Sequence, residues 1–285
     1  MKNYGVILGK RDEDYIAGVQ SPLGYEERNP SGDWRDYLPS EERQSSNFAD
    51  SMACVSFSAL NCVETQLKFV TGVEPNYSDR ALAKMSNTTT QGNYLWRVAD
   101  TIRLQGIVEE QYWPAPVDFT WDTYYTEIPA DVKNMAAGFL EKYDIKHEWL
   151  PENTSGTIDR DVLKYHLKHA PVQVVRPGHA IMCFYSGASV DKYFDHYDPF
   201  IKSYSQPFLQ AMKYIVTPKN NPMFELWAVA GSPEVWLIRD GKKTHVYNAA
   251  ALTAVSGFDK IIIVPQAQLD AVPDTGGDIA WLQRD

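Results

Sequence analysis

The hydrophobic residues of the first half of the chain recur at the spacing of amphipathic helices. From Ser51 onward they predict a largely buried helix that ends before the segment TGVEPN. The same pattern predicts a helix over SDRALAKMS and another over YLWRVADTIRLQG, with Gly106 as its C-cap. Two more amphipathic helices are predicted over PADVKNMAAGFLEKY and DRDVLKYHLKHA.

The pattern changes in the second half. PVQVVRPGHAIMCFYSG and KYFDHYDPF are rich in β-branched and aromatic residues and are bounded by glycine and proline, which indicates strands. Helices followed by strands are typical of the α+β class. After VTPKNNP, two further strand-like runs are joined by Asp240-Gly241, a strong signal for a two-residue hairpin. We therefore expect an extended N-terminal arm over 1–43, a main domain over 44–218 and a small β-rich C-terminal module over 223–285.

Composition and charge exclude several classes of protein. Hydrophobic residues make up 44% of the chain and aromatic residues 13%, which excludes a disordered chain. The formal charge of -10 and the pI of about 5.1 argue against nucleic acid as a partner. No secretory apolar segment and no membrane-spanning run is present, so we expect no membrane partner. The three cysteines lack metal-ligand spacing and predict no disulfide framework.

Cys54 is the first candidate for chemistry. With Asp50 or Ser51 as N-cap, it falls in the first turn of a helix, where unpaired backbone N–H groups favour a thiolate. The alternative role is that of a small hydrophobic residue in the core, which is common for an isolated cysteine. A catalytic thiol also needs a base nearby.

His179 is the best candidate for that base. It follows a Pro-Gly pair, opens the apolar run AIMCFY and precedes Asp195 by sixteen residues. Neighbouring antiparallel strands would place its imidazole beside the carboxylate, which orients such a base. The alternative is a core histidine satisfied by the backbone. His147, His166 and His169 lie in polar helical contexts, which predict surface or capping roles.

The order Gln44, Cys54, His179, Asp195 resembles the papain-like cysteine peptidases, which carry a glutamine, a nucleophile on the central helix, and a distant His and Asn. CVSFSALNCVE resembles their Cys-Trp-Ala-Phe-Ser-Ala helix, and DHYDP resembles their Asn-Ser-Trp-Gly turn. PVQVVRPGHAIMCFYSG is similar to their Gly-Pro-Val and His-Ala strands, and QGNYLWRVADTIRLQGIVEEQYWP to their Gly-Gly helix. The resemblance covers about residues 44 to 215 and extends to divergent proteins of bacteriophages and uncultured bacteria.

The resemblance implies a two-lobed fold, with a helical lobe and a β-barrel-like lobe, and a cysteine endopeptidase that acts on a protein or peptide substrate without cofactor or metal. Cys54 would attack the carbonyl, and His179 would form an ion pair with it and protonate the leaving amine. Asp195 would orient His179. Gln44 would donate its side-chain amide to the oxyanion, together with the backbone N–H of Cys54.

The chain also departs from the family pattern. The loop QSSNFADSMAC lacks the family's glycines, and Val55 and Tyr197 replace two tryptophans. Asp198 is an alternative to Asp195 as the third residue. No long helical pro-segment is expected before Gln44, although the arm could lie across the cleft.

Two other functions stay open. One is a structural or virion-assembly protein that keeps the papain fold with reduced or no activity. The other is a Cys/His amidase that acts on cell-wall peptides. The C-terminal module is similar to short β repeats of bacterial surface proteins, which predicts an assembly partner or a plain structural cap. The sequence leaves the location of the protein open, with the cytoplasm and a virion as the alternatives.

Overall fold

The computed structural model describes residues 3–18, 27–219, 224–232, 234–239, 242–246 and 261–273. Its backbone contacts divide the chain into a first unit, residues 1–219, and a second unit, residues 220–285. Each unit is considered by itself. Among the residues described, no helix is both long and apolar enough to cross a membrane.

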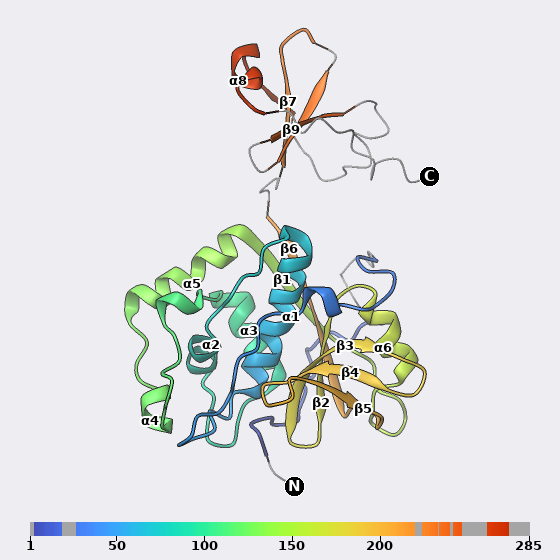
Figure 1. Cartoon of the computed structure of the whole chain (residues 1–285). Helices are drawn as coiled ribbons and strands as arrows, with labels where there is room; N and C mark the ends of the chain where they lie inside the picture. Colours follow the sequence, from blue (N-terminus) through green and yellow to red (C-terminus); the bar gives the residue numbers. More distant parts are fainter. Residues whose placement is uncertain are drawn as a thin grey trace. The chain divides into compact units, whose positions relative to one another are not determined.

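The first unit is built around helix α1, which runs from Cys54 to Thr71. Every residue of α1 from Cys54 to Leu67 is buried, as expected for a helix surrounded by other elements (Figure 1). The helix ends at Gly72, whose left-handed φ of 70° costs glycine no steric strain. The other helices of this side are α2 (Asp79–Met85), α3 (Leu95–Gln105), α4 (Trp121–Tyr124) and α5 (Ala130–Lys142), with 3₁₀ turns at Arg35–Tyr37 and Glu110–Tyr112.

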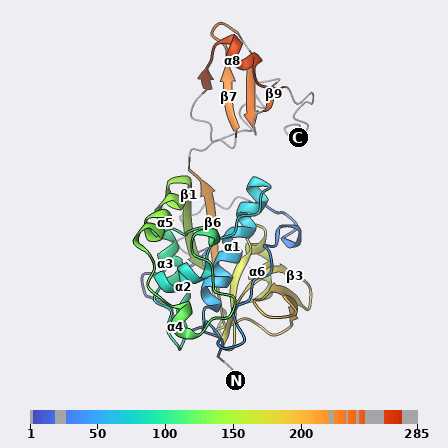
Figure 2. The ribbon, with the colours of Figure 1, turned by 60° about the vertical axis from the view of Figure 1, so that its left-hand side comes forward.

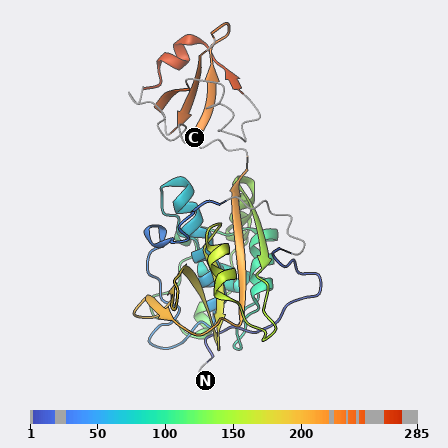
Figure 3. The ribbon, with the colours of Figure 1, turned by 90° about the vertical axis from the view of Figure 1, so that its right-hand side faces the viewer.

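A six-stranded antiparallel sheet forms the other side, in the order β1-β6-β2-β3-β4-β5. Its strands are β1 (Tyr143–Trp149), β2 (Val172–Arg176), β3 (His179–Ser186), β4 (Asp191–Phe194), β5 (Ile201–Tyr204) and β6 (Gln210–Pro218). Figure 3 shows the long strand β6, in orange, beside β1, in green. Helix α6 (Arg160–Leu167) packs on β2 and β3.

Helix α1 lies between helices α2 and α3 and the sheet (Figure 2). It contacts α2 and α3 on one side and β3 and β6 on the other. Val55, Leu60 and Val63 of α1 are fully buried in the same core as Val174 and Ile181 of the sheet. Each fully buried aliphatic side chain contributes about 1.5–3 kcal/mol. This packing therefore stabilises the unit and also fixes where the N-terminal end of α1 meets the sheet.

The second unit contains a four-stranded sheet in the order β10-β7-β8-β9. β10 runs parallel to β7, and the other neighbours are antiparallel. Arg239 pairs with Lys242, as in a hairpin with a two-residue turn, but Asp240-Gly241 itself lies outside the described residues. The elements are β7 (Phe224–Ala228), β8 (Val235–Arg239), β9 (Lys242–Val246), β10 (Ile261–Ile263) and the short helix α8 (Gln266–Asp270).

The structure confirms the predicted α+β class and corrects some local expectations. Helices and strands occur in the predicted segments, except that the strand predicted over KYFDHYDPF ends at Phe194, and the sequence pattern does not predict β1 or β6. The surface or capping roles expected for three histidines are wrong. His166 and His169 are only 4% and 2% exposed, and His147 lies on β1 rather than on a helix.

Candidate active site

The loop before α1 places Cys54 at the first residue of the helix. Ala53 is the N-cap, so the expectation that Asp50 or Ser51 caps the helix is wrong. The backbone at Met52 has a left-handed φ of 56°, which is not helical, so the helix begins only after this residue. Asp50 instead accepts a hydrogen bond from the backbone N–H of Met52 at 3.0 Å, which stabilises this loop.

Two elements converge on the thiol of Cys54. The side chain is fully buried, and its sulfur accepts a hydrogen bond from the backbone N–H of Ala180 at 3.4 Å. Ala180 directly follows His179, which is the first residue of β3. Both the helix N-terminus and this N–H donor favour a negative sulfur. The packing of α1 on β3 thus brings the predicted nucleophile to the residue that follows the predicted base.

The hairpin between β2 and β3 presents His179. Arg176 pairs with His179 across a tight turn in which Gly178 has a φ of 74°. Nε2 of His179 lies 2.6 Å from Oδ1 of Asp195, the residue that follows β4. Nδ1 of His179 is buried and has no hydrogen-bond partner among the described residues. One ring nitrogen is therefore held by a carboxylate while the other is free to exchange a proton.

The carboxylate that lies beside His179 is that of Asp195 rather than that of Asp198. Asp195 is fully buried and also accepts a hydrogen bond from the backbone N–H of His196 at 2.8 Å. Asp198 has a largely exposed side chain and pairs with Arg43. Of these two carboxylates, only that of Asp195 is hydrogen-bonded to the imidazole.

Burial and the neighbouring charges shift the pKa values of these groups. Burial lowers the pKa of His179, while the hydrogen bond and charge of Asp195 act in the opposite direction. Burial alone would raise the pKa of Asp195, but the hydrogen bond and charge of His179 bring it well below its usual range. Burial raises the pKa of the Cys54 thiol, and the charges of Asp50 and Asp195 add to this. Both shifts favour the uncharged pair, a protonated thiol and a neutral imidazole.

Gln44 lies close to the other predicted residues, but its side-chain amide is occupied. Nε2 of Gln44 donates to the backbone carbonyl of Tyr4 at 2.7 Å and to Oδ1 of Asp50 at 2.8 Å. The backbone N–H of Gln44 donates to the carbonyl of His196, which ties the loop to the turn after β4. The donor expected for an oxyanion therefore binds a carbonyl of the protein's own N-terminal arm.

The first residues of the arm lie on the candidate site. The ring of Tyr4 packs against the ring of His179, with 4.8 Å between centroids, and against Tyr197 at 5.2 Å. The backbone N–H of Tyr4 donates to the carbonyl of Gly178 at 2.7 Å, and the carbonyl of Gly5 accepts from Asn93 at 2.9 Å. The sequence suggested that an arm could reach this cleft, but no local signal singles out Tyr4.

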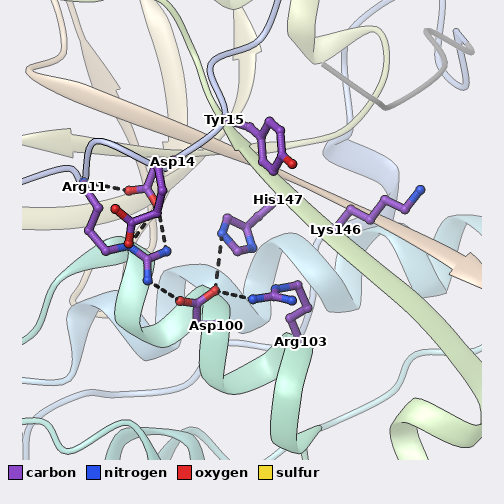
Figure 4. A pocket seen from close by; sticks show the side chains of 8 residues that line it. Arg11, Asp14, Tyr15, Asp100, Arg103, Lys146 and His147 are labelled. Carbon is purple, nitrogen blue, oxygen red and sulfur yellow. Dashed lines mark hydrogen bonds and ion pairs between the residues drawn. The ribbon is translucent and has the colours of Figure 1, made fainter. Parts of the chain in front are cut away.

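A second group of contacts fastens the arm farther along. Arg11 donates to Asp14 of the arm and to Asp100 of α3, and Asp14 accepts from the indole of Trp149 at 2.9 Å. Figure 4 shows Asp100 between Arg11 and Arg103, with His147 of β1 above them. These charged side chains line a pocket of about 370 Å³. The ion pair of Arg11 with Asp100 therefore holds the arm against α3, and the hydrogen bond of Trp149 to Asp14 holds it against β1.

Lys202 is the other residue at the site that the sequence does not single out. Its ammonium donates to Oδ2 of Asp195 at 2.6 Å. It lies seven residues after Asp195, on the next strand of a hairpin, so its proximity to His179 could be found only from the register of β4 and β5.

Comparisons with known proteins support the fold. A scan of protein-family models and a search of curated protein sequences gave no match. Among solved structures, procathepsin L 3 from the larval midgut of Tenebrio molitor is 17% identical, with a TM-score of 0.50 over 72% of this chain and 75% of that chain. A cysteine protease of Carica candamarcensis is 16% identical, with a TM-score of 0.46 over 66% of this chain and 97% of that chain. The bromelain protease of Ananas comosus is 15% identical, with a TM-score of 0.43 over the same shares.

None of these structures is more than 17% identical to this chain. They do not support an association with bacteriophages or virions. The match to procathepsin L 3 agrees with the central buried helix, the helices on one side of it and the antiparallel sheet on the other. The chain therefore has the papain-like fold of the cysteine proteases.

Proposed function

We propose that this protein is a cysteine endopeptidase that hydrolyses peptide bonds through an acyl-thioester. One observation carries the proposal. Cys54 lies at the N-terminal end of α1 against the start of β3, and His179 there keeps Nδ1 without a described hydrogen-bond partner while Asp195 holds Nε2. A nucleophile, a base and a group that orients the base are the parts that covalent acyl transfer requires.

The proposed reaction proceeds in two halves. His179 takes the proton of Cys54, and the thiolate attacks the substrate carbonyl to form a C–S bond. The imidazolium then gives its proton to the leaving amine as the C–N bond breaks, which leaves the acyl group on sulfur. His179 next takes a proton from water as the water attacks the thioester carbonyl to form a C–O bond. The C–S bond then breaks, the acid is released, and the imidazolium returns its proton to the sulfur of Cys54. Asp195 keeps the ring oriented throughout.

The oxyanion that forms during each half of the reaction needs hydrogen-bond donors. Gln44 and the backbone N–H of Cys54 are the proposed pair, and one such donor typically lowers the barrier by about 2.7–4 kcal/mol. The side-chain amide of Gln44 now binds the carbonyl of Tyr4. We therefore propose that the arm must move before a substrate carbonyl can reach this donor, and that hydration of the opened site allows the thiolate to form.

A second candidate is a papain-fold protein with reduced or no activity. It is favoured by the complete burial of Cys54 and by the raised pKa of its thiol. A thiol of this kind is normally unreactive.

Labelling with a peptidyl epoxide or vinyl sulfone, followed by peptide mapping, tests the proposal. The peptidase predicts selective modification of Cys54 in the native protein. Cys62 and Cys183 are equally buried and serve as internal controls. Equal labelling of all three thiols, or labelling only after denaturation, would favour the inactive protein.

A further inference from the structure

The two oxygens of the Asp195 carboxylate have different partners. Oδ1 is shared by Nε2 of His179 at 2.6 Å and the backbone N–H of His196 at 2.8 Å. Oδ2 accepts a hydrogen bond from Nζ of Lys202 at 2.6 Å. Asp195 is 0% exposed, and a buried carboxylate is costly unless a positive group compensates its charge. Lys202 is in direct contact with the oxygen that does not face the imidazole.

The sheet directs Lys202 to this position. Lys202 lies on β5 opposite Tyr193 of β4, and the chain between them forms the turn that carries Asp195. Nζ of Lys202 also donates to the backbone carbonyl of Tyr197 at 2.9 Å. The side chain is only 22% exposed. Its ammonium is therefore held between the carboxylate and the turn instead of extending into solvent.

We propose that Lys202 is a positioning residue that neutralises Asp195, so that the carboxylate orients His179 without leaving a net negative charge beside Cys54. The inference rests on the proposed function in one respect, because it takes His179 as the base. The contact between Lys202 and Asp195 is independent of that function.

The expected effect depends on all charged and titratable groups around the pair. Those groups are Tyr4 of the arm, Asp50 of the loop before α1, Cys54 of α1, Arg176 of β2, Tyr193 of β4, His196 and Tyr197 of the turn, and Lys202 of β5. Arg176 lies farther away, with Nη2 4.0 Å from Oδ2 of Asp195. Burial lowers the pKa of His196 to about 3, so this ring is neutral near pH 7. Lys202 is thus the nearest cation to the carboxylate other than the imidazolium itself.

Removing the ammonium of Lys202 should raise the pKa values of both His179 and Cys54. An uncompensated Asp195 stabilises the imidazolium form of His179, so the pKa of His179 rises. The same negative charge disfavours the Cys54 thiolate, so the pKa of the thiol rises as well. A charge change at this range shifts a pKa by about one unit or more. Both limbs of a pH–activity profile are expected to move to higher pH.

The test uses the full chain with Cys54→Ala, in which His179 titrates without the thiol, and follows the His179 ring by NMR. Lys202→Met should raise the pKa of His179 by about one unit, and Lys202→Arg should restore it. The double variant Lys202→Met, Asp195→Asn removes both charges, and its His179 ring should have a pKa close to that of the parent. Lys192→Met is the matched control, because Lys192 contacts Ser203 on the neighbouring strand. In chains that retain Cys54, the pH profile of alkylation should move in the same direction.

An unchanged His179 titration in folded Lys202→Met would overturn the inference. So would equal shifts in the single and double variants, because the effect would then not depend on the charge of Asp195. If Lys202→Met does not fold, the double variant decides: a folded chain with the parent titration supports charge compensation, and an unfolded one assigns Lys202 a structural role. The expected NMR pattern in a chain that never hydrolyses peptides supports the inference and counts only against the proposed function.

Discussion

Replacing Gly5 by alanine is expected to uncover the candidate active site. Gly5 has a φ of 111°, a backbone conformation that L-residues rarely adopt. A Cβ built on Gly5 would lie 1.9 Å from the carbonyl oxygen of Met52 and 2.4 Å from its carbonyl carbon. These atoms belong to the backbone of the loop that precedes Cys54. Alanine therefore cannot be accommodated unless the arm or the loop moves.

The size of the effect follows from the contacts that the arm would lose. The segment is held by the bonds of Tyr4 to Gly178 and Gln44, and by those of Gly5 and Ile7 to Asn93. A hydrogen bond contributes about 0.5–1.5 kcal/mol net, and left-handed strain at a non-glycine residue costs about 1–2 kcal/mol. A destabilisation of the bound arm by about 3 kcal/mol is therefore expected. Since 1.4 kcal/mol is tenfold, the open population should rise roughly 100-fold.

The assay is the rate at which iodoacetamide modifies Cys54, read by peptide mapping, together with turnover of a peptide substrate. Gly18→Ala is the matched control. Gly18 also has a positive φ, of 78°, but a Cβ there would meet nothing within 4 Å. Both variants thus add strain to the arm, and only Gly5→Ala adds the collision. A folded Gly5→Ala protein that is alkylated at the wild-type rate would refute the reasoning.

Three further predictions concern Asp195, the partly buried Glu110 and the second unit. Asp195→Ala should lower kcat/KM for a peptide roughly 10²-fold, whereas Asp198→Ala should stay within about twofold, because only Asp195 contacts the imidazole; similar losses would show that the acid is misassigned. Burial raises the pKa of Glu110 to about 7, above the value of about 4.3 expected in the unfolded chain. The contribution of Glu110 to the free energy of unfolding is therefore complete below about pH 4.3 and is lost as the pH rises through about 7. Glu110→Gln should therefore raise the melting temperature by a few °C at pH 8 but not at pH 4, with exposed Glu109→Gln as control, and an equal change at both pH values would contradict this. A chain that ends at Lys219 should fold and hydrolyse a peptide at the full-length rate while losing any association with an assembly partner, and an insoluble chain would show that the first unit needs the second.

The local elements of this protein can be predicted from its sequence with few errors. The apolar spacing after Ser51 predicts α1, and the Pro-Gly turn between β-branched runs predicts the hairpin that presents His179. Such patterns are reliable because the period of buried side chains and the conformations open to proline and glycine are properties of a few neighbouring residues. The roles of Gln44, Cys54, His179 and Asp195 came from their order along the chain, and these roles stay predictions.

Other features depend on contacts between distant segments, and only the tertiary structure decides them. β1 pairs with β6 over the register from Tyr143↔Pro218 to Trp149↔Met212, and no local pattern encodes that partner. The position of Asp195 beside His179 depends on the pairing of β3 with β4, and the approach of Lys202 to Asp195 depends on the register of β4 and β5. The path of the arm depends on whether Gly5 fits against another backbone. In each case the deciding quantity is steric fit or charge between residues far apart in sequence, and it exists only once the chain has folded.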